Sequence, residues 1–481
     1  MALSFRSDAY IDGGWVSSGK RFAVLNPANQ EKVAEVPDLG AAETEQAIEA
    51  AHAAFPAWSG KIQKERSAIL RKWFDLMMAD VDRLAHLITL EGGKPLAEAK
   101  GEVAYAASFI EWFAEEAKRA YGHTIPTTTP TRRYVTIKQP VGVCAAITPW
   151  NFPAAMIARK VGPALAAGCT FVIKPPHQTP LTALAMAELG EQAGIPKGVL
   201  NVVTTNTHVA EVGKTLCESP KVSKFSFTGS TATGKMLGAM CVGSTVKRVS
   251  LELGGNAPLI IFADCDLEAA VKGAIACKFR NAGQTCVCAN RILVEDKIYD
   301  SFAKKFADAT KALKIGPGDQ DGVAIGPLID AKAMEKVERM VAEAIDAGAE
   351  PLTGGKPSNV GKQFFTPTVL ANVTREMRVN REEIFGPVAP LIRFKTDDEA
   401  TAIANDTPFG LAAYFFTKDV HRAWRMAERL QYGMVSINDG ILSTEVAPFG
   451  GIKQSGLGRE GASEGLDEYL DVKYINFGGF A

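Results

Sequence analysis

The sequence predicts an α/β protein with two doubly wound parallel-sheet domains of the Rossmann-like type and a small additional β element. Strand and helix patterns alternate from Val141 to Thr228, as repeated βα units do. The alternation stops at Glu252-Leu-Gly-Gly255 and starts again at Pro258. Outside both regions, Arg132–Lys138 alternates with a period of two, which predicts an extended strand.

The composition is that of an ordinary globular protein. The 481 residues predict two to four domains of roughly 100–200 residues each. The 53 Lys and Arg residues nearly balance the 54 Asp and Glu residues, and 47% of the chain is hydrophobic. These values exclude a disordered or collagen-like chain, and without a basic excess they argue against nucleic-acid binding.

Neither secretion nor membrane insertion is expected. Eight cysteines are too few for a disulfide scaffold, and no apolar segment follows a basic start, so we expect a cytoplasmic protein with reduced thiols. The uncharged run Val141–Ala158 contains Pro149, Asn151 and Pro153 at its centre. We expect a buried strand that leads into a loop there, rather than a membrane span.

The first third of the chain is predicted to be helical. We expect helices around Ala41–Trp58, Lys64–Leu90 and Ala97–Tyr121, with the breaker Gly92-Gly93-Lys94-Pro95 before the last one. The turn residues Thr127–Pro130 precede the alternating segment. A protruding hairpin is therefore predicted between Pro126 and Gln139.

The next segments supply the two sheets. The predicted strands and helices of the first are 143–147, 155–167, 170–174, 182–193, 199–203, 210–217, 224–228 and 246–251. Those of the second begin with 258–262, 267–281 and 292–294 and continue to about Ser436. Ligands of such sheets bind at the carboxyl ends of strands, where Thr148–Asn151, Lys174–His177 and Thr228–Ser230 lie.

Two glycine-rich patterns imitate nucleotide-binding loops. Gly456–Gly461 spells G-x-G-x-x-G, but no apolar strand leads into it and too few residues follow it for a βαβ unit, so we predict a closely packed turn. Gly229–Lys235 spells most of a Walker A loop, but Met236 replaces the required Ser or Thr. At Ser230 a strand still meets a helix start, which favours an anion such as a pyrophosphate; an ordinary tight turn is the alternative.

Cys286 is the candidate nucleophile. It follows the polar, glycine-containing stretch Phe279–Thr285, where exposure and nearby backbone N–H groups would lower its pKa. Glu252, at the end of a predicted strand, is the neighbouring acid or base candidate. The six histidines are scattered without metal-ligand spacing, so no metal site is predicted.

These segments together resemble the aldehyde dehydrogenase superfamily, and most closely its succinate-semialdehyde dehydrogenases, over essentially the whole chain. The matching motifs, in order, are Thr148–Pro153, Lys174-Pro175, Phe227–Ser230, Glu252–Gly255, Gly283–Cys286, Glu383–Pro387 and Pro448–Gly451. The resemblance implies a coenzyme-binding domain (1–125 and 141–252), a catalytic domain (253–440), an oligomerisation element (126–140 and 462–481) and a return segment to the coenzyme domain (441–461). It also implies a homodimer or homotetramer.

The resemblance assigns roles to individual residues. Cys286 is expected to attack the aldehyde, and Asn151 and the Cys286 backbone N–H to hold the oxyanion. Glu252 is expected to act as the general base that hydrolyses the resulting thioester. The implied cofactor contacts are Trp150, Lys174, His177, Gly229, Ser230, Glu383 and Phe385.

One cofactor position departs from the family pattern. His177 stands where a glutamate often binds both hydroxyls of the adenosine ribose. Without that carboxylate, Lys174 and a partly protonated His177 could attract a 2′-phosphate, so we expect NADP to be preferred, with NAD as the other possibility. The alternative is that His177 only packs against the adenine.

Substrate identity depends on three residues. Arg159, Arg280 and Ser443 look like the carboxylate clamp of succinate-semialdehyde dehydrogenases, which implies NAD(P)-dependent oxidation of succinate semialdehyde to succinate. Glutarate semialdehyde or another acid-bearing aldehyde is the alternative substrate, because such a clamp counts methylene groups poorly. The arginines could instead be structural salt-bridge partners.

Other functions stay open at this stage. A Cys286–Glu252 pair could serve a thiol esterase without redox function, and the fold could serve a non-catalytic role. Cys288 is a candidate redox partner of Cys286, although so short a loop would strain a disulfide, and simple packing is the alternative.

Overall fold

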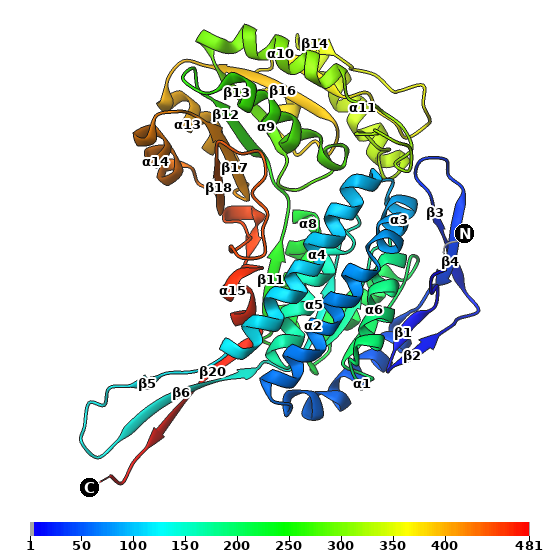
Figure 1. The fold of residues 1–481 in the computed structure, drawn as a ribbon, viewed down its shortest axis with the longest axis vertical. Helices are drawn as coiled ribbons and strands as arrows, with labels where there is room; N and C mark the ends of the chain where they lie inside the picture. The colour runs from blue at the N-terminus through cyan, green and yellow to red at the C-terminus, as the bar shows by residue number, and fades with distance from the viewer. Residues whose placement is uncertain (1–3, 481) are drawn as a thin grey trace.

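The computed structural model describes residues 4–480. Two sheet-containing bodies lie one above the other, and a narrow β arm projects from the lower one, away from the upper one (Figure 1). Residues 1–3 and 481, at the outer ends of the expected coenzyme-binding and oligomerisation segments, lie outside the described residues.

The lower body contains a mixed sheet with the strand order β19-β11-β10-β7-β8-β9-β1-β2. The strands are β1 (Ala9–Ile11), β2 (Gly14–Val16), β7 (Val143–Ile147), β8 (Thr170–Lys174), β9 (Leu200–Val202), β10 (Val222–Thr228), β11 (Arg248–Glu252) and β19 (Gly456–Leu457). The strands from β11 to β9 are parallel, as predicted, whereas β1, β2 and β19 join the edges in antiparallel fashion.

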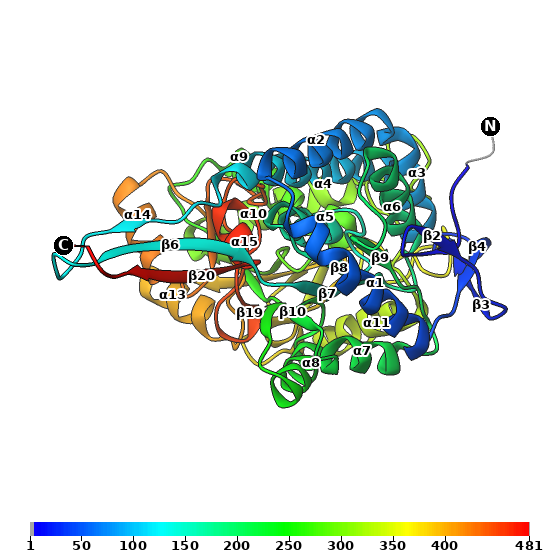
Figure 2. The same ribbon diagram turned by 90° about the horizontal axis from the view of Figure 1, so that it is seen from below.

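Helices cover both faces of this sheet (Figure 2). They are α1 (Ala41–Ser59), α2 (Gln63–Ala79), α3 (Val81–Gly92), α4 (Leu96–Glu116), η1 (Ala117–Arg119), α5 (Ala155–Ala167), α6 (Leu181–Ala193), α7 (Val209–Glu218) and α8 (Thr231–Ser244). The apolar strand β7 serves both faces: Cys144 and Ala146 pack in the core with α4, α5 and α6, and Val143 and Ala145 in the core with α1 and α7.

The upper body has a second sheet, with the order β14-β15-β16-β13-β12-β17-β18. Its strands are β12 (Ala257–Ile261), β13 (Ala289–Glu295), β14 (Glu350–Thr353), β15 (Thr368–Ala371), β16 (Val388–Phe394), β17 (Ala412–Phe416) and β18 (Met434–Ile437). Its helices are α9 (Leu267–Phe279), η2 (Arg280–Gly283), η3 (Asp296–Ile298), α10 (Tyr299–Lys311), α11 (Ala331–Asp346), α12 (Arg378–Arg381), α13 (Asp397–Asn405) and α14 (Val420–Arg429). Only the edge strand β14 is antiparallel to its neighbour among the described residues.

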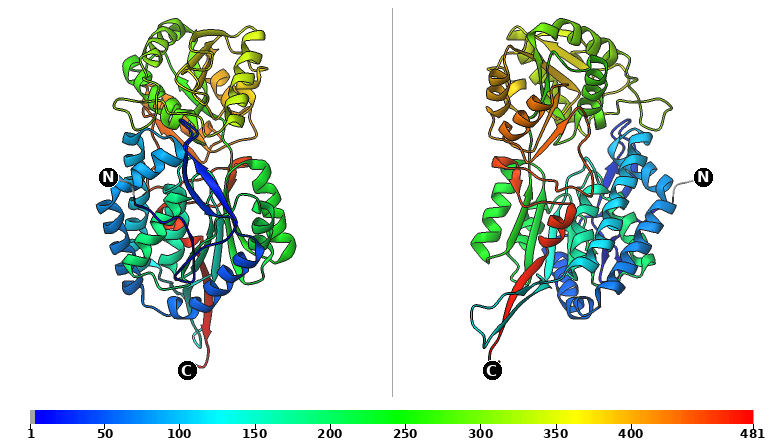
Figure 3. Two further views of the ribbon diagram at one scale, coloured as in Figure 1. Left: turned by 90° about the vertical axis from the view of Figure 1, so that its right-hand side faces the viewer. Right: turned by 60° about the vertical axis from the view of Figure 1, so that its left-hand side comes forward.

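The arm is a three-stranded sheet (Figure 3). It consists of β5 (Thr124–Ile125), β6 (Arg133–Pro140) and β20 (Leu470–Phe477). The register runs from Leu470 opposite Pro140 to Phe477 opposite Arg133, so the chain's last strand pairs with the predicted hairpin. A separate ribbon of β3 (Arg21–Leu25) and β4 (Lys32–Pro37), a short α15 (Ala462–Asp467) and η4 (Lys453–Ser455) complete the structure.

Some sequence-based expectations were wrong or incomplete. The helical run Lys64–Leu90 is divided between α2 and α3, because Asp80 has a non-helical backbone (φ −109°, ψ 18°). The strands before Ala41 were not predicted, and both sheets are mixed rather than purely parallel. Gly456 does pack closely, since a Cβ there would lie 1.9 Å from the Leu251 carbonyl oxygen. Between residues 4 and 480, no helix is long and apolar enough to cross a membrane.

Candidate active site

The segments singled out from the sequence come together where strands of the lower sheet end. Asn151 lies in the loop after β7, and Ser230 lies just after β10. Strand β8 ends in Lys174, and strand β11 ends in Glu252. Strands β7, β8, β10 and β11 are neighbours in one sheet, so these side chains share one edge. Cys286 reaches them from the upper body, because the Cys286 carbonyl oxygen would lie 2.3 Å from a Cβ on Gly255. That glycine lets the two segments touch.

The turn before Cys286 has an unusual backbone. Asn281, Ala282 and Gly283 have consecutive positive φ angles of 51°, 54° and 74°. Non-glycine residues in this region are strained and are found most often at functional sites. A Cβ on Gly283 would lie 2.2 Å from the Gly386 carbonyl oxygen, so only glycine fits there. The backbone conformation of this loop therefore restricts which residues can occupy positions 281–283.

The Cys286 thiol is half-buried. Burial raises its pKa to about 12; the charges of Glu383 and Glu252 act in the same direction, whereas Arg159 and Arg280 oppose them. The sequence-based expectation of a lowered pKa is wrong for this state of the protein, because the loss of solvation outweighs the nearby cations. Thiolate formation at neutral pH therefore needs a base.

Glu252 is a buried carboxyl group close to that thiol. Burial raises its pKa well above the ordinary value, and the charge of Glu460 adds to the effect. Its Oε2 has no hydrogen-bond partner among residues 4–480. Gly450 leaves room for the carboxyl group, since a Cβ there would lie 3.0 Å from Oε1. These properties suit a proton acceptor or donor better than a structural anchor.

Glu460 is buried beside Glu252 but is fully paired. Its Oε2 accepts a 2.7 Å hydrogen bond from Arg159 Nε, and its Oε1 pairs with Lys160 Nζ. Lys160 Nζ also donates to Ser226 Oγ at 2.9 Å. Despite burial, the charges of Arg159 and Lys160 hold the pKa of Glu460 at about 2. Arg159, expected to bind substrate, is therefore placed in a buried ion pair, which was the alternative interpretation.

Asn151 is fixed by several hydrogen bonds. Its backbone carbonyl oxygen accepts from Lys94 Nζ at 2.8 Å and from Asn281 Nδ2 at 3.2 Å, and its side-chain Nδ2 donates to the Gln284 carbonyl at 3.1 Å. The second hydrogen of that amide is left for a ligand. Lys94 also pairs with buried Glu102. Sequence reasoning missed Lys94, which it treated only as part of a helix breaker, because nothing in the segment Gly92–Pro95 shows that this lysine is buried.

Two aromatic residues and a helix start form the expected cofactor surface. The Trp150 and Phe385 rings meet edge to face with centroids 5.7 Å apart, and Phe385 has a φ of 58°. Ser230 is the N-cap of α8, where its Oγ accepts from the Thr233 N–H at 3.3 Å. Gly229 has no room for a side chain, because a Cβ would lie 2.5 Å from the Phe227 ring. The free N–H groups of α8 remain available to an anion.

The remaining cofactor candidates carry buried ionisable groups. Lys174 Nζ donates to the Pro175 carbonyl at 3.1 Å, and burial lowers its pKa to about 8. Two of its three protons are left for hydroxyl or phosphate oxygens. Glu383 accepts from the Gly255 N–H at 3.0 Å, and burial raises its pKa to about 7. Together with the α8 terminus, this set of donors and acceptors fits a dinucleotide.

His177 is less basic than the sequence suggested. Burial lowers its pKa, as do the charges of Lys174 and Lys332, while Asp330 opposes them. Partial protonation of His177 in the free protein is therefore not favoured. The positive charge near this position comes from the two lysines.

The other substrate candidates line a separate pocket of about 290 Å³. Arg280 and Ser443 contribute to its wall, together with Tyr105, Phe152 and Lys94. The Arg280 guanidinium lies 5.3 Å from the centre of the Phe152 ring and makes no ion pair with another described residue. Phe152 directly follows Asn151, so this pocket adjoins the proposed reaction centre.

Cys288 is buried below the Cys286 loop. Its Sγ donates to the Gly283 carbonyl at 3.3 Å, and Lys278 Nζ donates to it at 3.7 Å. Cys286 and Cys288 are both free thiols in this structure. The redox role of Cys288 stays a prediction.

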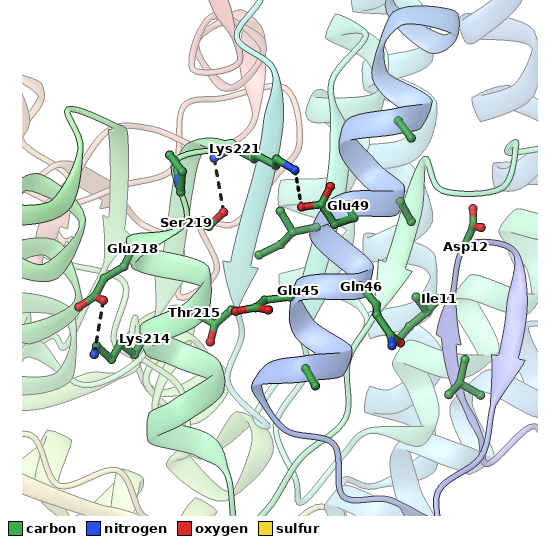
Figure 4. Close-up of a pocket in the computed structure, with 16 residues that line it drawn as sticks. Ile11, Asp12, Glu45, Gln46, Glu49, Lys214, Thr215, Glu218, Ser219 and Lys221 are labelled. Atoms are coloured by element: carbon green, nitrogen blue, oxygen red, sulfur yellow. Dashed lines mark hydrogen bonds and ion pairs between the residues drawn. The ribbon is translucent and has the colours of Figure 1, made fainter.

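A larger pocket of about 1350 Å³ lies elsewhere, between α1, α7 and β1 (Figure 4). It holds none of the predicted site residues. Both lysines that line it are paired, Lys221 with Glu49 and Lys214 with Glu218. Size alone therefore does not identify the site in this protein.

Comparisons with known proteins agree with this geometry. The aldehyde dehydrogenase family model matches residues 15–475. Over 480 residues, the chain is 58% identical to glutarate-semialdehyde dehydrogenase of Pseudomonas aeruginosa, covering 99% of each chain. It is also 58% identical to succinate-semialdehyde dehydrogenase (NADP(+)) GabD of Escherichia coli, covering 98% of each. The crystal structure of an E. coli NADP-dependent enzyme matches it with a TM-score of 0.97 and 57% identity, covering 98% of each chain.

Proposed function

The chain belongs to the aldehyde dehydrogenase family, and on that premise we propose that it oxidises succinate semialdehyde to succinate with NADP or NAD. The observation that carries the substrate assignment is the pocket beside Asn151, whose wall contains the unpaired guanidinium of Arg280 and the hydroxyl of Ser443. Both groups suit a carboxylate at the far end of a short aldehyde.

Cys286 begins the reaction. Its thiol transfers a proton to Glu252, directly or through a water molecule, and the sulfur attacks the aldehyde carbon to form a thiohemiacetal. The unused amide hydrogen of Asn151 and the Cys286 N–H donate to the developing oxyanion; each such donor is worth about 10²–10³ in rate. Lys94 and Asn281 hold the Asn151 backbone carbonyl, and the Gln284 carbonyl accepts from the side-chain amide itself.

A nicotinamide bound beside Cys286 would accept the hydride of the thiohemiacetal. Loss of hydride leaves a thioester on Cys286. Glu252 releases the proton from Cys286 to solvent, takes a proton from a water molecule that attacks the thioester, and passes it to the Cys286 thiolate as the acid product leaves. A buried, raised-pKa carboxyl group with an unpartnered oxygen suits both proton transfers.

The dinucleotide is proposed to contact Lys174, Glu383 and the start of α8 at Ser230. Trp150 and Phe385 are proposed to lie near the nicotinamide. We expect NADP to be preferred, because the two lysines near His177, Lys174 and Lys332, outnumber the one carboxylate there, Asp330. The name of the E. coli relative, which includes NADP(+), supports this preference. A thiol esterase would leave these cofactor groups without a purpose.

Glutarate semialdehyde is the second candidate substrate. The P. aeruginosa relative is named for glutarate semialdehyde and the E. coli relative for succinate semialdehyde, and both are 58% identical to this chain. Sequence identity therefore supports the two substrates equally. One methylene group changes binding by only about 1–3 kcal/mol, so both acids can be accepted.

The test compares succinate semialdehyde, glutarate semialdehyde and butanal, each with NADP and NAD, in the wild type and in Arg280→Ala. We expect the substitution to raise KM for either acid by about 10- to 100-fold, the loss of a charge-assisted bond, and to change KM for butanal by less than about threefold. Arg425→Ala, an exposed substitution on α14, is the control. Equal effects on acid and neutral aldehydes would remove the assignment.

The domain boundaries and the assembly are further parts of the proposal. The sheet memberships support separate coenzyme-binding and catalytic units, and the pairing of β19 with β11 supports a return of residues 441–461 to the first. The arm carries exposed Val472, Tyr474 and Phe477, which supports its use in a homodimer or homotetramer. The eight free thiols suit the reducing cytoplasm.

A further inference from the structure

Tyr105 is a pocket residue that neither the sequence motifs nor the proposed mechanism uses. It lies on α4 and lines the same pocket as Arg280 and Ser443. Its ring packs edge to face on the Phe109 ring, with centroids 5.0 Å apart, and Phe109 is completely buried. The position of the Tyr105 ring is therefore set by the core of the lower body.

The Tyr105 hydroxyl is the notable group. It is buried and makes no hydrogen bond of good geometry within residues 4–480, although the Ser443 side chain lies near enough to lower its pKa. A buried hydroxyl without a partner destabilises a folded protein, so most of them are satisfied. A buried hydroxyl that lacks a partner in the wall of a pocket is explained if a bound ligand accepts its hydrogen bond.

The charges around the pocket indicate what kind of ligand that is. Lys94 is compensated by Glu102, and Glu98 accepts a 2.8 Å hydrogen bond from the Asn281 N–H. Burial raises the pKa of Glu98, whereas the charges of Lys94 and Arg280 lower it. Arg280 is thus the cation left for a ligand in this wall, and the hydroxyls of Tyr105 and Ser443 add two neutral donors.

We infer that Tyr105 is a specificity-determining residue whose hydroxyl donates a hydrogen bond to the remote carboxylate of the acid aldehyde; this inference rests on the proposed function. A carboxylate accepts up to about four hydrogen bonds, so it can use Arg280, Ser443 and Tyr105 together. A neutral aldehyde leaves the hydroxyl unpaired. Sites built to bond a polar group reject analogues that lack it.

The test is Tyr105→Phe, which keeps the ring and removes only the hydroxyl. We expect kcat/KM for succinate semialdehyde to fall by about 10- to 100-fold, mainly through KM, and kcat/KM for butanal to change by less than about threefold. Calorimetric binding of succinate, which needs no turnover, should weaken by a similar factor. Tyr121→Phe, at an exposed tyrosine beyond α4, is the matched control.

The melting temperature of the free protein separates substrate binding from structural support. Removing an unpaired hydroxyl should leave the melting temperature of Tyr105→Phe unchanged or raise it. A lower melting temperature with equal losses for both aldehydes would show a packing role and overturn the inference. If the wild type itself fails to favour succinate semialdehyde over butanal, the proposed function fails. If the wild type favours it and Tyr105→Phe keeps the same preference and the same succinate affinity, only the role of Tyr105 fails.

Discussion

Two buried glutamates, Glu252 and Glu460, lie in one cluster of charges and have opposite properties. Glu460 is bonded to Arg159 and paired with Lys160, which hold its pKa at about 2. Glu252 has one oxygen without a partner in the described chain, and burial raises its pKa well above the ordinary value. Equal burial therefore yields a permanent anion in one case and a group poised for proton transfer in the other.

The same contrast separates two arginines. Arg159 is completed by Glu460 and lies 3.9 Å from the centre of the Phe449 ring, so its charge supports the fold. Arg280 has no carboxylate partner in the described structure and faces a pocket. The comparison shows that a fully paired buried charge depends on its partner for stability, whereas a charge or polar group left unpaired is available to a ligand.

Replacing the proposed nucleophile, Cys286, should have the largest effect on the reaction rate and little effect on the stability of the fold. We expect Cys286→Ala to lower kcat by about 10⁴-fold or more, because the thioester route is lost, while the melting temperature changes little. Steady-state reduction of the cofactor measures this, and Cys288→Ala is the control with most of the activity retained. Substantial turnover by Cys286→Ala would place the nucleophile elsewhere.

Removing the paired carboxylate should instead damage the fold. Glu460→Gln leaves Arg159 and Lys160 without their partner, and we expect a loss of about 3–5 kcal/mol in the free energy of unfolding. Because the folded pKa of about 2 lies below the ordinary 4.5, the stability that Glu460 contributes is complete above pH 4.5 and disappears as the pH falls towards 2. Urea unfolding across this range should show wild type and variant converging in acid. A constant difference would contradict the pairing.

A smaller effect is expected at the cofactor site. His177→Glu adds a carboxylate near Lys174 and Lys332 and should move the ratio of kcat/KM for NADP over NAD by about tenfold towards NAD. His177→Gln separates the new charge from the loss of the imidazole. An unchanged ratio would mean that this side chain does not face the 2′-position.

The smallest effect concerns stability in alkali. The folded pKa of Glu252 is raised, so its contribution to stability is present below the ordinary pKa of 4.5 and is lost as the pH rises through the folded value. Glu252→Gln cannot ionise and should become more stable than the wild type as the pH increases. Thermal unfolding at a series of pH values measures this, and parallel curves would show that Glu252 is not desolvated.

The sequence predicted those parts of the structure that depend on local pattern. Fully buried strands such as β7 and β8, bounded by turns and followed by helices, were predicted within a residue or two. The strands before Ala41 were missed because they are short and depend on distant partners, such as Tyr10 opposite Val202. The division between α2 and α3 at Asp80 carries no proline or glycine signal.

Sequence motifs predicted the residues of the candidate site, but they did not predict its ion pairs or the direction of its pKa shifts. Cys286, Glu252 and Asn151 could be named from their segments, but the partner of Arg159 lies about 300 positions away, at Glu460. The direction of the Cys286 pKa also depends on how far the folded chain excludes water, which no local pattern reveals. Tyr105 was overlooked because a single tyrosine in an alanine-rich helix looks like core.

The central claim is that the unpaired Glu252 carries out the chemistry of thioester hydrolysis. The most direct measurement mixes Glu252→Gln with succinate semialdehyde and NADP, follows the first turnover and examines the protein by mass spectrometry. The claim predicts a burst of about one reduced cofactor per subunit, then very slow turnover, with a succinyl thioester on Cys286. Should the Cys286 thiol stay unmodified while turnover continues at the wild-type rate, Glu252 would not be the base.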